Sequence, residues 1–482
     1  MNYVPSIYDW GTRNNNMISK KTKIVCTIGP ATDSVEALTS LVEAGMNVCR
    51  LNFSHGTHEQ HAELIKRIRI TSEKTNQPLC ILQDLQGPKI RVGDLPEQGV
   101  ELVAGKTIIF TSGQGDIPNK IPVTYPNLHR DVKSGQRLLL DDGLLEVMVK
   151  SINDQDVICQ VMTGGTLKSH KGLNLPETQT QISAISDKDK EDITFGVAQG
   201  VDWIALSFVR KPEDVQELKR LIGDVTIKVI AKIEKPEAVA NMDAIIAEVD
   251  GIMVARGDLG IELPAERVPI IQKELITKCR LAGKPVIVAT QMLDSMIKNP
   301  RATRAEISDV ANAVIDHADA TMLSGETASG AHPIEAVKTM AATIIETEKS
   351  SYDDVIPEMR ESKNPEVSVT NIASILGRAS HAKAIVVTSL SGEAVRYVSR
   401  ERPEQPIYAM TTSDRVVRQL NLSWGVRGFM VPKVDTVPEL IDASIERLKK
   451  ENYIGVGDEI VIVAGEPLGA SGSVNLVELR KI

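Results

Sequence analysis

The sequence is poor in aromatic residues and has no long apolar run. Phe, Trp and Tyr together make up only 3% of its 482 residues, so it lacks the aromatic platforms on which single-stranded nucleic acids stack. No apolar run reaches the roughly 18 residues that a membrane-spanning helix needs. The formal net charge of −9 argues further against a polyanion or an anionic membrane as the main partner. These absences predict a protein that binds neither nucleic acid nor a membrane.

Cysteine is also scarce, and its spacing excludes two kinds of site. The count of 5 is odd and no two cysteines stand at CxxC spacing, so we expect neither a disulfide framework nor a zinc centre. Unpaired thiols are typical of a reducing compartment, which predicts a cytoplasmic protein. The N-terminal residues contain an Asn run at 14–16 and no apolar core of a signal peptide. We interpret residues 1–21 as an N-terminal extension.

Short β-branched runs alternate with helical patterns over most of the chain. Eight such strand–helix units predict a (β/α)8 TIM barrel. Within the helices we expect an N-cap at Asp33, and one continuous helix that starts at Pro236 and carries an apolar face as far as Val249. The expected barrel strands are Lys23–Ile28, Asn47–Asn52, Leu79–Leu85, Asp202–Val209, Thr226–Ile233, Gly251–Ala255, Pro285–Thr290 and Ala320–Leu323.

The strand–helix rhythm is interrupted once and is followed by a second unit. Residues 88–185 show short alternating runs between turn residues, which predicts an all-β domain inserted after the third barrel strand. The C-terminal residues form another α/β pattern, with strands expected at Ala384–Thr388, Ile407–Met410 and Glu459–Val463. The predicted fold class is therefore α/β. Its predicted parts are 1–21 (extension), 22–87 (barrel, first part), 88–185 (β-rich insert), 186–350 (barrel, second part), 351–366 (linker) and 367–482 (C-terminal α/β domain).

Polar side chains stand where the barrel strands end, which is where the active sites of such barrels lie. Glu234 and Asp258 end adjacent strands and can share one Mg²⁺ whose remaining ligands are substrate oxygens. Lys232 lies two residues before Glu234 and points to the same side of the strand, where it can stabilise a transferring phosphoryl group or an enolate. Arg50 and Arg91 add anion-binding capacity. This set of groups fits phosphoryl transfer, in which positioning and charge neutralisation do most of the catalysis.

Each of these residues also has a plainer structural interpretation. Lys232 and Glu234 could form an ordinary salt bridge of the barrel, Asp84 or Asp258 alone could be a turn or cap residue, and His55 could be a loop histidine. We favour the functional interpretation because seven of the eight strands end in polar groups at one edge of the barrel.

Six motifs resemble those of pyruvate kinases, over essentially the whole chain from Thr22 to Ile482. The resemblance implies a barrel domain A, a lid domain B formed by the insert, and a C-terminal regulatory domain C. The motifs are TKIVCTIGP (22–30), MNVCRLNFSHG (46–56), KIEKPE (232–237), DGIMVARGDLGIE (250–262), ATQMLDSMIKNPRATRAEISDVANAV (289–314) and MLSGETASG (322–330).

The reaction implied by this resemblance is transfer of the phosphoryl group of phosphoenolpyruvate to ADP, which gives pyruvate and ATP in the last step of glycolysis. The family implies Mg²⁺, or Mn²⁺ in its place, as the cofactor. It also implies a cytoplasmic, allosterically regulated homotetramer.

The resemblance also implies a role for each matching residue. Lys232 would contact the transferring phosphoryl group and stabilise the enolate. Thr290 would contact the substrate carboxylate and, with Ser324 and a water, is one candidate for delivering the proton to the enolate carbon. Catalysis is thus assigned to Lys232, Arg50, Thr290 and Ser324; substrate binding to Arg50, Lys232, Ala255, Arg256, Gly257, Asp258 and Thr290; nucleotide binding to Asn52, His55, Arg91 and Lys171; and metal binding to Glu234 and Asp258.

One departure from the family pattern concerns the monovalent cation. Family members that require K⁺ carry a Thr directly after the Asp of strand three and a Glu after the next Gly-Pro pair. Here Leu85 follows Asp84, and Lys89 follows the Gly-Pro pair. Leu85 removes one K⁺ ligand from a region that also includes Asn52 and Ser54, and Lys89 introduces a tethered cation. The sequence therefore resembles the K⁺-independent branch, and we hypothesise that activity does not require K⁺.

A second departure lies in the C-terminal domain. Family members activated by sugar bisphosphates bind them at a Ser/Thr-rich phosphate loop. The corresponding loop keeps hydroxyl groups and a glycine but adds an acid, and its candidate effector residues are Thr388, Ser389, Ser391, Gly392 and Glu393. A carboxylate beside a phosphate is unfavourable, so we predict weak or no activation by fructose 1,6-bisphosphate. A sugar monophosphate or AMP as effector stays open.

Two other functions also stay open. A barrel lyase or aldolase that acts on an enol-pyruvate through Mg²⁺ would share Lys232, Glu234 and Asp258, but it would not need a lid that carries Arg91 and Lys171. A non-catalytic sensor would keep the fold and bind a metabolite through the C-terminal domain. Such a sensor should have lost some catalytic groups, whereas all of the expected ones are present here.

Overall fold

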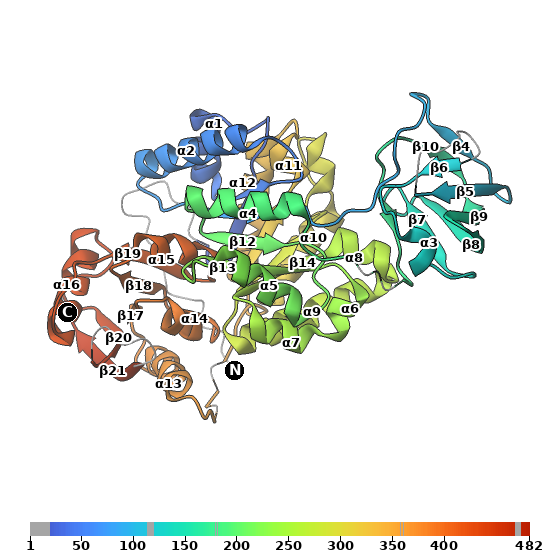
Figure 1. Ribbon diagram of the computed structural model, residues 1–482. Coiled ribbons are helices and arrows are strands. Elements are labelled where there is room, and N and C mark those ends of the chain that lie inside the picture. Colours follow the sequence, from blue (N-terminus) through green and yellow to red (C-terminus); the bar gives the residue numbers. More distant parts are fainter. Residues whose placement is uncertain are drawn as a thin grey trace.

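The computed structural model describes residues 20–112, 120–178, 180, 182–356, 358–359, 361–467 and 474–482. Figure 1 shows a central barrel of strands and helices, with a β-rich insert on one side and a smaller α/β unit on the other. Residues 1–19 of the predicted N-terminal extension lie outside the described part of the chain.

The central strands close into the predicted eight-stranded barrel, in the order β1-β16-β15-β14-β13-β12-β3-β2. All neighbouring pairs are parallel, so the fold class is confirmed. The strands are β1 (Lys23–Thr27), β2 (Val48–Asn52), β3 (Cys80–Asp84), β12 (Trp203–Leu206), β13 (Lys228–Ile233), β14 (Gly251–Ala255), β15 (Val286–Ala289) and β16 (Ala320–Leu323).

Helices cover the outside of this barrel and give each strand two apolar faces. Val25 and Met253 pack inside the barrel, whereas their neighbours Ile24 and Ile252 pack against the helices. This double burial explains why the strands are continuous apolar runs. The helices are α1 (Val35–Ala44), α2 (His58–Thr75), α4 (Asp187–Gln199), α5 (Pro212–Ile222), α6 (Pro236–Ala240), α7 (Met242–Glu248), α8 (Arg256–Glu262), α9 (Val268–Ala282), α10 (Arg304–Ile315), α11 (Gly325–Ala328) and α12 (Pro333–Glu348).

Two helix predictions were wrong in detail. The N-cap of α1 is Ser34 and not Asp33, because the Ser34 hydroxyl accepts a hydrogen bond from the backbone N–H of Ala37. The single helix expected from Pro236 is two helices, α6 and α7, separated at Asn241. Asn241 has φ −103° and ψ 15°, and its side chain donates to the carbonyl of Arg210 at 2.9 Å, which holds the backbone out of helical geometry.

The insert has its own sheets and its own core. Six strands pair in the order β11-β7-β8-β9-β5-β6, and β10 pairs with β4. Phe110, Leu138 and Val147 are fully buried in a core separate from that of the barrel. The elements are β4 (Val100–Leu102), β5 (Thr107–Thr111), β6 (Lys120–Pro122), α3 (Leu128–Asp131), β7 (Arg137–Leu140), β8 (Leu145–Asn153), β9 (Asp156–Thr163), β10 (Gly165–Leu167) and β11 (Leu173–Asn174).

The C-terminal unit is a five-stranded sheet in the order β19-β18-β17-β20-β21, with only β21 antiparallel. Helices α13 and α14 contribute to the core on one face and α16 to the core on the other. The elements are α13 (Pro365–Ala379), β17 (Ala384–Thr388), α14 (Glu393–Ser399), β18 (Ile407–Thr411), α15 (Asp414–Gln419), β19 (Val426–Met430), α16 (Val437–Lys450), β20 (Glu459–Gly465) and β21 (Val474–Lys481).

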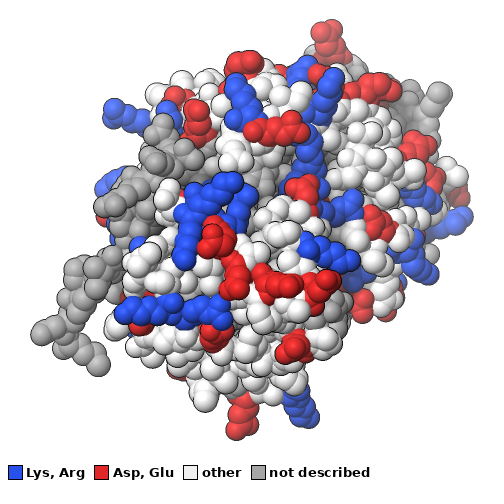
Figure 2. Space-filling view, turned by 90° about the vertical axis from the view of Figure 1, so that its left-hand side faces the viewer, with Lys and Arg blue, Asp and Glu red and all other residues white. Residues whose placement is uncertain are grey.

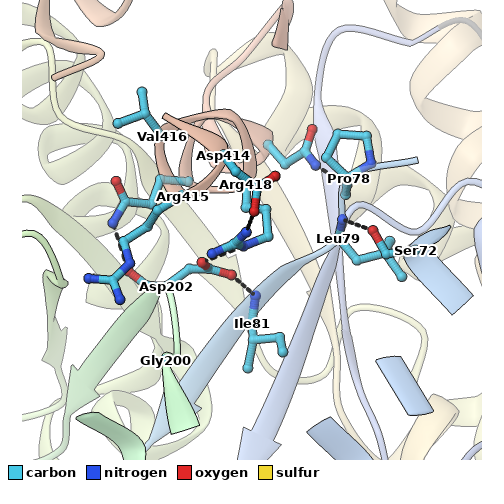
Figure 3. A network of polar contacts seen from close by, with 12 residues as sticks. Ser72, Pro78, Leu79, Ile81, Gly200, Asp202, Asp414, Arg415, Val416 and Arg418 are labelled. Carbon is cyan, nitrogen blue, oxygen red and sulfur yellow. Dashed lines mark hydrogen bonds and ion pairs between the residues drawn. The ribbon is translucent and has the colours of Figure 1, made fainter. Parts of the chain in front are cut away.

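A buried carboxylate fixes the C-terminal unit against the base of the barrel (Figure 3). Asp202, at the start of β12, is fully buried. It accepts from Arg418 Nε of α15 at 2.8 Å, from the backbone N–H of Ile81 at 2.8 Å and from Arg69 at 3.3 Å. Leu422, which follows α15, is buried inside the barrel core itself. The C-terminal unit therefore closes the end of the barrel opposite the carboxyl ends of the strands.

We expect Asp202→Ala to lower the stability of the folded chain by about 3 kcal/mol, because it leaves two arginines at a mostly buried interface without their carboxylate. A lower midpoint of thermal unfolding would show the effect. Asp414→Ala is a matched control, because Asp414 pairs with the same Arg418 but is 70% exposed, and such a pair contributes only about 0.5 kcal/mol. Equal midpoints for the two variants would contradict the prediction.

Candidate active site

The carboxyl ends of the barrel strands bring a network of charged side chains together. Arg50 of β2 donates from Nε to Asp84 Oδ2 of β3 at 2.7 Å, and from Nη1 to Thr27 Oγ1 of β1 at 2.8 Å. Thr27 Oγ1 in turn donates to the carbonyl of Leu323 in β16 at 3.0 Å. Three neighbouring strands and their hydrogen bonds thus hold the guanidinium of Arg50 at the mouth of the barrel.

Lys232 is at the centre of the network. Its Nζ lies 2.8 Å from Glu234 Oε1, 3.4 Å from Asp84 Oδ1 and 2.8 Å from Ser207 Oγ. Its side chain is 12% exposed, and the side chains of the two acids are 1% exposed. The ammonium group is therefore oriented by partners from three different strand ends, close to the entrance of the site.

The charge states in this cluster follow from burial and from neighbouring charges. Burial opposes the charge of Lys232, but Asp84 and Glu234 outweigh it and raise its pKa. Burial also opposes ionisation of Asp84, but Lys232 and Arg50 hold its pKa below the ordinary value. For Glu234, burial together with nearby Asp258 prevails over Lys232, and its pKa is raised. The negative charge of Glu234 is thus undercompensated, and a divalent cation beside it would relieve this.

The donor set fits a cation whose ligands come partly from substrate. The described residues contain no group of three or more His, Cys, Asp and Glu side chains able to hold a metal. Asp258 lines the cavity at the mouth of the barrel and forms no hydrogen bond or salt bridge with a described residue. Glu234 Oε2 accepts from the backbone N–H of Phe208 at 2.8 Å, which orients the second carboxylate. Two carboxylates with free coordination positions between them suit Mg²⁺.

A strained turn lies opposite these carboxylates. Thr290, directly after β15, has φ +68°, and Gln291 has φ +55°, a region that a β-branched residue rarely adopts. Thr290 Oγ1 accepts from the backbone N–H of Gly257 at 2.7 Å. Arg256 donates to the Thr290 carbonyl at 2.8 Å and to Asp309 Oδ1 of α10 at 2.7 Å. The surroundings thus over-determine this turn, as is common where strain is kept at a functional site.

Arg256 therefore acts by holding the strained turn in position. Its side chain turns toward α10 and the strained turn, whereas the backbone of Ala255, Gly257 and Asp258 borders the site. Gly257 and Asp258 line a cavity of about 880 Å³ that extends from the strand ends along α8 to α10. Ser324, the first residue after β16, donates its backbone N–H to buried Glu326 at 2.7 Å.

The side chains of the two insert residues proposed for nucleotide binding form no hydrogen bond or salt bridge with a described residue of the barrel. Arg91 Nη1 donates to the carbonyl of His170 at 2.9 Å. Lys171 Nζ lies 2.7 Å from Asp141 Oδ1, and this carboxylate raises the pKa of Lys171. Both side chains are therefore held on the insert, on the strand and turn that face the barrel.

The β2–α2 loop carries the other proposed nucleotide residues. His55 is exposed, and Asn52 Oδ1 accepts from the backbone N–H of Ser54 at 3.1 Å. Leu85 is buried among the apolar residues outside the barrel, so its side chain offers nothing to a cation. Lys89 lies where the chain passes from the first part of the barrel into the insert, and it lines the cavity beside Asp258. No hydrogen bond or salt bridge joins its ammonium group to a described residue, whereas its backbone N–H donates to the carbonyl of Gly87 at 2.9 Å.

Sequence reasoning missed two residues of the network. Thr27, which holds Arg50, is the last residue of β1. This strand was the one of the eight that was not counted among those with polar ends. Ser207 stood at a strand end but was given no role, and its hydroxyl bridges Lys232 and the carbonyl of Leu85. A polar residue at the last position of an otherwise apolar barrel strand, as for Thr27, or directly after it, as for Ser207, is the signal that could have identified both.

A separate cavity of about 620 Å³ lies at the carboxyl edge of the C-terminal sheet. Four of the five candidate effector residues line it: Thr388, Ser389, Ser391 and Glu393. Its other charged lining residues are Glu366, Lys433 and Asp435, so acids outnumber bases three to one.

The surface shows no strong field of one sign on the face drawn in Figure 2, because acidic side chains border the basic ones. Among the described residues, no helix has the length and apolar character needed to cross a bilayer. The mixed charge of this face does not favour nucleic acid as its partner.

Comparison with known proteins points to one family. Residues 19–337 match the pyruvate kinase barrel domain and residues 368–479 match the pyruvate kinase alpha/beta domain. The pyruvate kinase of Geobacillus stearothermophilus is 46% identical over 96% of this chain and 81% of the relative. That of Clostridium acetobutylicum is 42% identical over 96% of this chain and 100% of the relative.

A solved structure agrees with the sequence matches. The crystal structure of a pyruvate kinase from Cryptosporidium parvum superposes with a TM-score of 0.89 at 37% identity, and the match covers 96% of both chains. The chain is an enzyme that belongs to the pyruvate kinase family.

Proposed function

We propose that the chain transfers the phosphoryl group of phosphoenolpyruvate to ADP, with Mg²⁺, at the mouth of the barrel. The observation that carries this proposal is the position of Lys232. It is a buried, charged lysine between Asp84 and Glu234, and Asp258, which lines the cavity at the mouth of the barrel, helps to raise its pKa. Phosphoryl transfer needs such a fixed cation where negative charge develops.

The chain's own residues supply orientation and charge in this reaction. Arg50, held by Asp84 and Thr27, would bind the phosphoryl group, and Lys232 would stabilise the enolate that remains after transfer. Thr290 Oγ1 accepts from Gly257, so its own O–H is free to donate toward the substrate carboxylate or, with Ser324, toward the enolate carbon. Closure of the insert would bring Arg91 and Lys171 to the nucleotide and exclude water.

Glu234 and Asp258 would hold the Mg²⁺. When bound, the ion would neutralise charge on the substrate oxygens. We also propose the family's homotetrameric assembly for this chain.

Lys232→Met should reduce pyruvate formation at least about a thousand-fold, because it removes the charge that stabilises the reacting oxygens. A coupled assay of pyruvate measures this, and circular dichroism checks that the variant is folded. Lys228→Met is a matched control, because Lys228 starts the same strand and pairs with Asp250 at 3.0 Å, at the opposite end of the barrel. Activity of the folded Lys232 variant within tenfold of the wild type would refute the assignment.

We further propose that activity does not require K⁺. Two observations support this. Leu85 is buried in an apolar core and so provides no hydroxyl ligand. Lys89, five residues after Asp84, has an ammonium group without a hydrogen bond or salt bridge to a described residue, and it lines a cavity beside Asp258. A tethered ammonium of this kind can take over the role of a bound monovalent cation.

In buffer free of K⁺ and NH₄⁺ we expect full activity of the wild type and a loss of at least about tenfold for Lys89→Glu, because the variant replaces the tethered cation with an acid. Leu85→Thr combined with Lys89→Glu should regain activity when K⁺ is added. Lys150→Glu, an exposed change on β8 of the insert, is the control. Activity of the wild type only with K⁺ would refute the role of Lys89 and leave the reaction unaffected.

The acidic lining of the C-terminal cavity is unfavourable for a bisphosphate, which supports the expectation that bisphosphates bind weakly there. We expect fructose 1,6-bisphosphate to change the half-saturating concentration of phosphoenolpyruvate by less than about twofold, because the described lining of the cavity holds three acids, Glu366, Glu393 and Asp435, against one base, Lys433. Glucose 6-phosphate and AMP are added in parallel as singly phosphorylated alternatives. Strong activation by the bisphosphate would contradict the prediction.

A further inference from the structure

One carboxylate beside the proposed metal site connects the barrel to the insert. Glu262, the last residue of α8, accepts at Oε1 from Lys235 Nζ at 2.6 Å and from Asn174 Nδ2 at 2.8 Å. Lys235 follows β13 in the barrel, whereas Asn174 ends β11 in the insert. The contact therefore joins two parts of the molecule that have separate hydrophobic cores.

Both barrel residues of this contact are neighbours of the proposed metal ligands. Lys235 directly follows Glu234, and Glu262 lies four residues after Asp258 on α8, so that these two carboxylates share a helix face. Lys235 Nζ also lies 5.9 Å from the ring centroid of Phe208, whose backbone N–H donates to Glu234. Glu262 is thus connected to Glu234 through Lys235, and to Asp258 through one turn of α8.

Burial makes the contact sensitive to the loss of either donor. The side chain of Glu262 is 1% exposed and that of Lys235 is 20% exposed. Glu262 Oε2 is buried and has no hydrogen-bond partner among the described residues, so Oε1 receives all of its charge compensation. A buried carboxylate that loses a donor is destabilised far more than an exposed one.

The last turn of α8 touches the insert at a second point, which gives the contact a defined orientation. A Cβ atom placed on Gly143 would lie 3.8 Å from Ile261 Cγ2. The backbone next to Gly143 is in turn connected to the proposed nucleotide lysine, because Asp141 pairs with Lys171 and donates its N–H to the carbonyl of Gly172. The same short helix therefore borders the substrate with its first turn and the insert with its last.

We propose that Glu262 is a positioning residue for the reaction: through Asn174 it sets where the insert, and with it Lys171, stands relative to Asp258. This inference rests on the function proposed above. It implies that weakening the contact impairs the nucleotide step more than the binding of phosphoenolpyruvate, because the residues that border phosphoenolpyruvate belong to the barrel.

Exchange of donor and acceptor tests the proposal. Asn174→Asp places a second carboxylate against Glu262, and we expect the KM for ADP to rise at least about tenfold while the KM for phosphoenolpyruvate changes less than about threefold. Combining it with Glu262→Gln restores one carboxylate and one amide, with Lys235 still within reach of the carboxylate. The double variant should reverse at least half of the rise in the KM for ADP. Amide hydrogen exchange over residues 164–178, without ligands, should be faster in the single variant and normal in the double.

Two exposed substitutions serve as matched controls, Asn153→Asp at the tip of a hairpin in the insert and Glu266→Gln just after α8. Both should leave the exchange and the ratio of the two KM values unchanged. The proposal is overturned if Asn174→Asp changes neither the hydrogen exchange nor the ratio of the two KM values by more than twofold. It is also overturned if both KM values rise equally and the double variant lowers neither of them. If the wild type forms no pyruvate, the proposed function fails, while hydrogen exchange still reports whether Glu262 holds the insert.

Discussion

The site depends on keeping one cation inside a low-dielectric barrel mouth. Lys232 is almost fully buried, and it stays charged because Asp84 and Glu234 lie within 3.4 Å and 2.8 Å of its Nζ. Those acids in turn need further partners, which Arg50 and the N–H of Phe208 supply. Each partner is fixed by its own strand end, so the chemistry of the site follows from closing all eight strands into one barrel. A barrel with one strand displaced would leave a buried charge without compensation, which is among the most costly defects in a protein.

Much of the fold could be predicted from the sequence, because burial on two faces produces apolar runs that are easy to recognise. The C-terminal strands show where this fails. Strand β19 contains Arg427 and Gly428, and β21 alternates exposed and half-buried residues at the edge of its sheet. Neither has the continuous apolar character that revealed the central strands. The break at Asn241 was missed for a similar reason, since a side-chain hydrogen bond to a distant carbonyl leaves no periodic signal.

The candidate site was predictable to the level of strand ends but not of side-chain direction. Sequence position placed Lys232, Glu234 and Asp258 together because parallel strands end at one edge. It could not indicate that Arg256 turns away toward Asp309, or that Lys171 is paired with Asp141 within the insert. Those orientations depend on partner residues far away in the sequence. An arginine or a lysine can pair with many different acids, so the residue type alone does not identify the partner.

The docking of the C-terminal unit also has a consequence for how the chain is made. Lys23, in the first barrel strand, donates from its buried Nζ to the carbonyl of Val426, and the backbone N–H of Gly425 donates to Lys21. Leu422 fills the base of the barrel. A ribosome that has completed the eighth strand has therefore still not supplied the groups that the first strand needs. The base of the nascent barrel therefore stays uncovered until about a hundred further residues have been synthesised. Although the enzyme consists of several modules, its barrel and its C-terminal unit are completed together, late in synthesis.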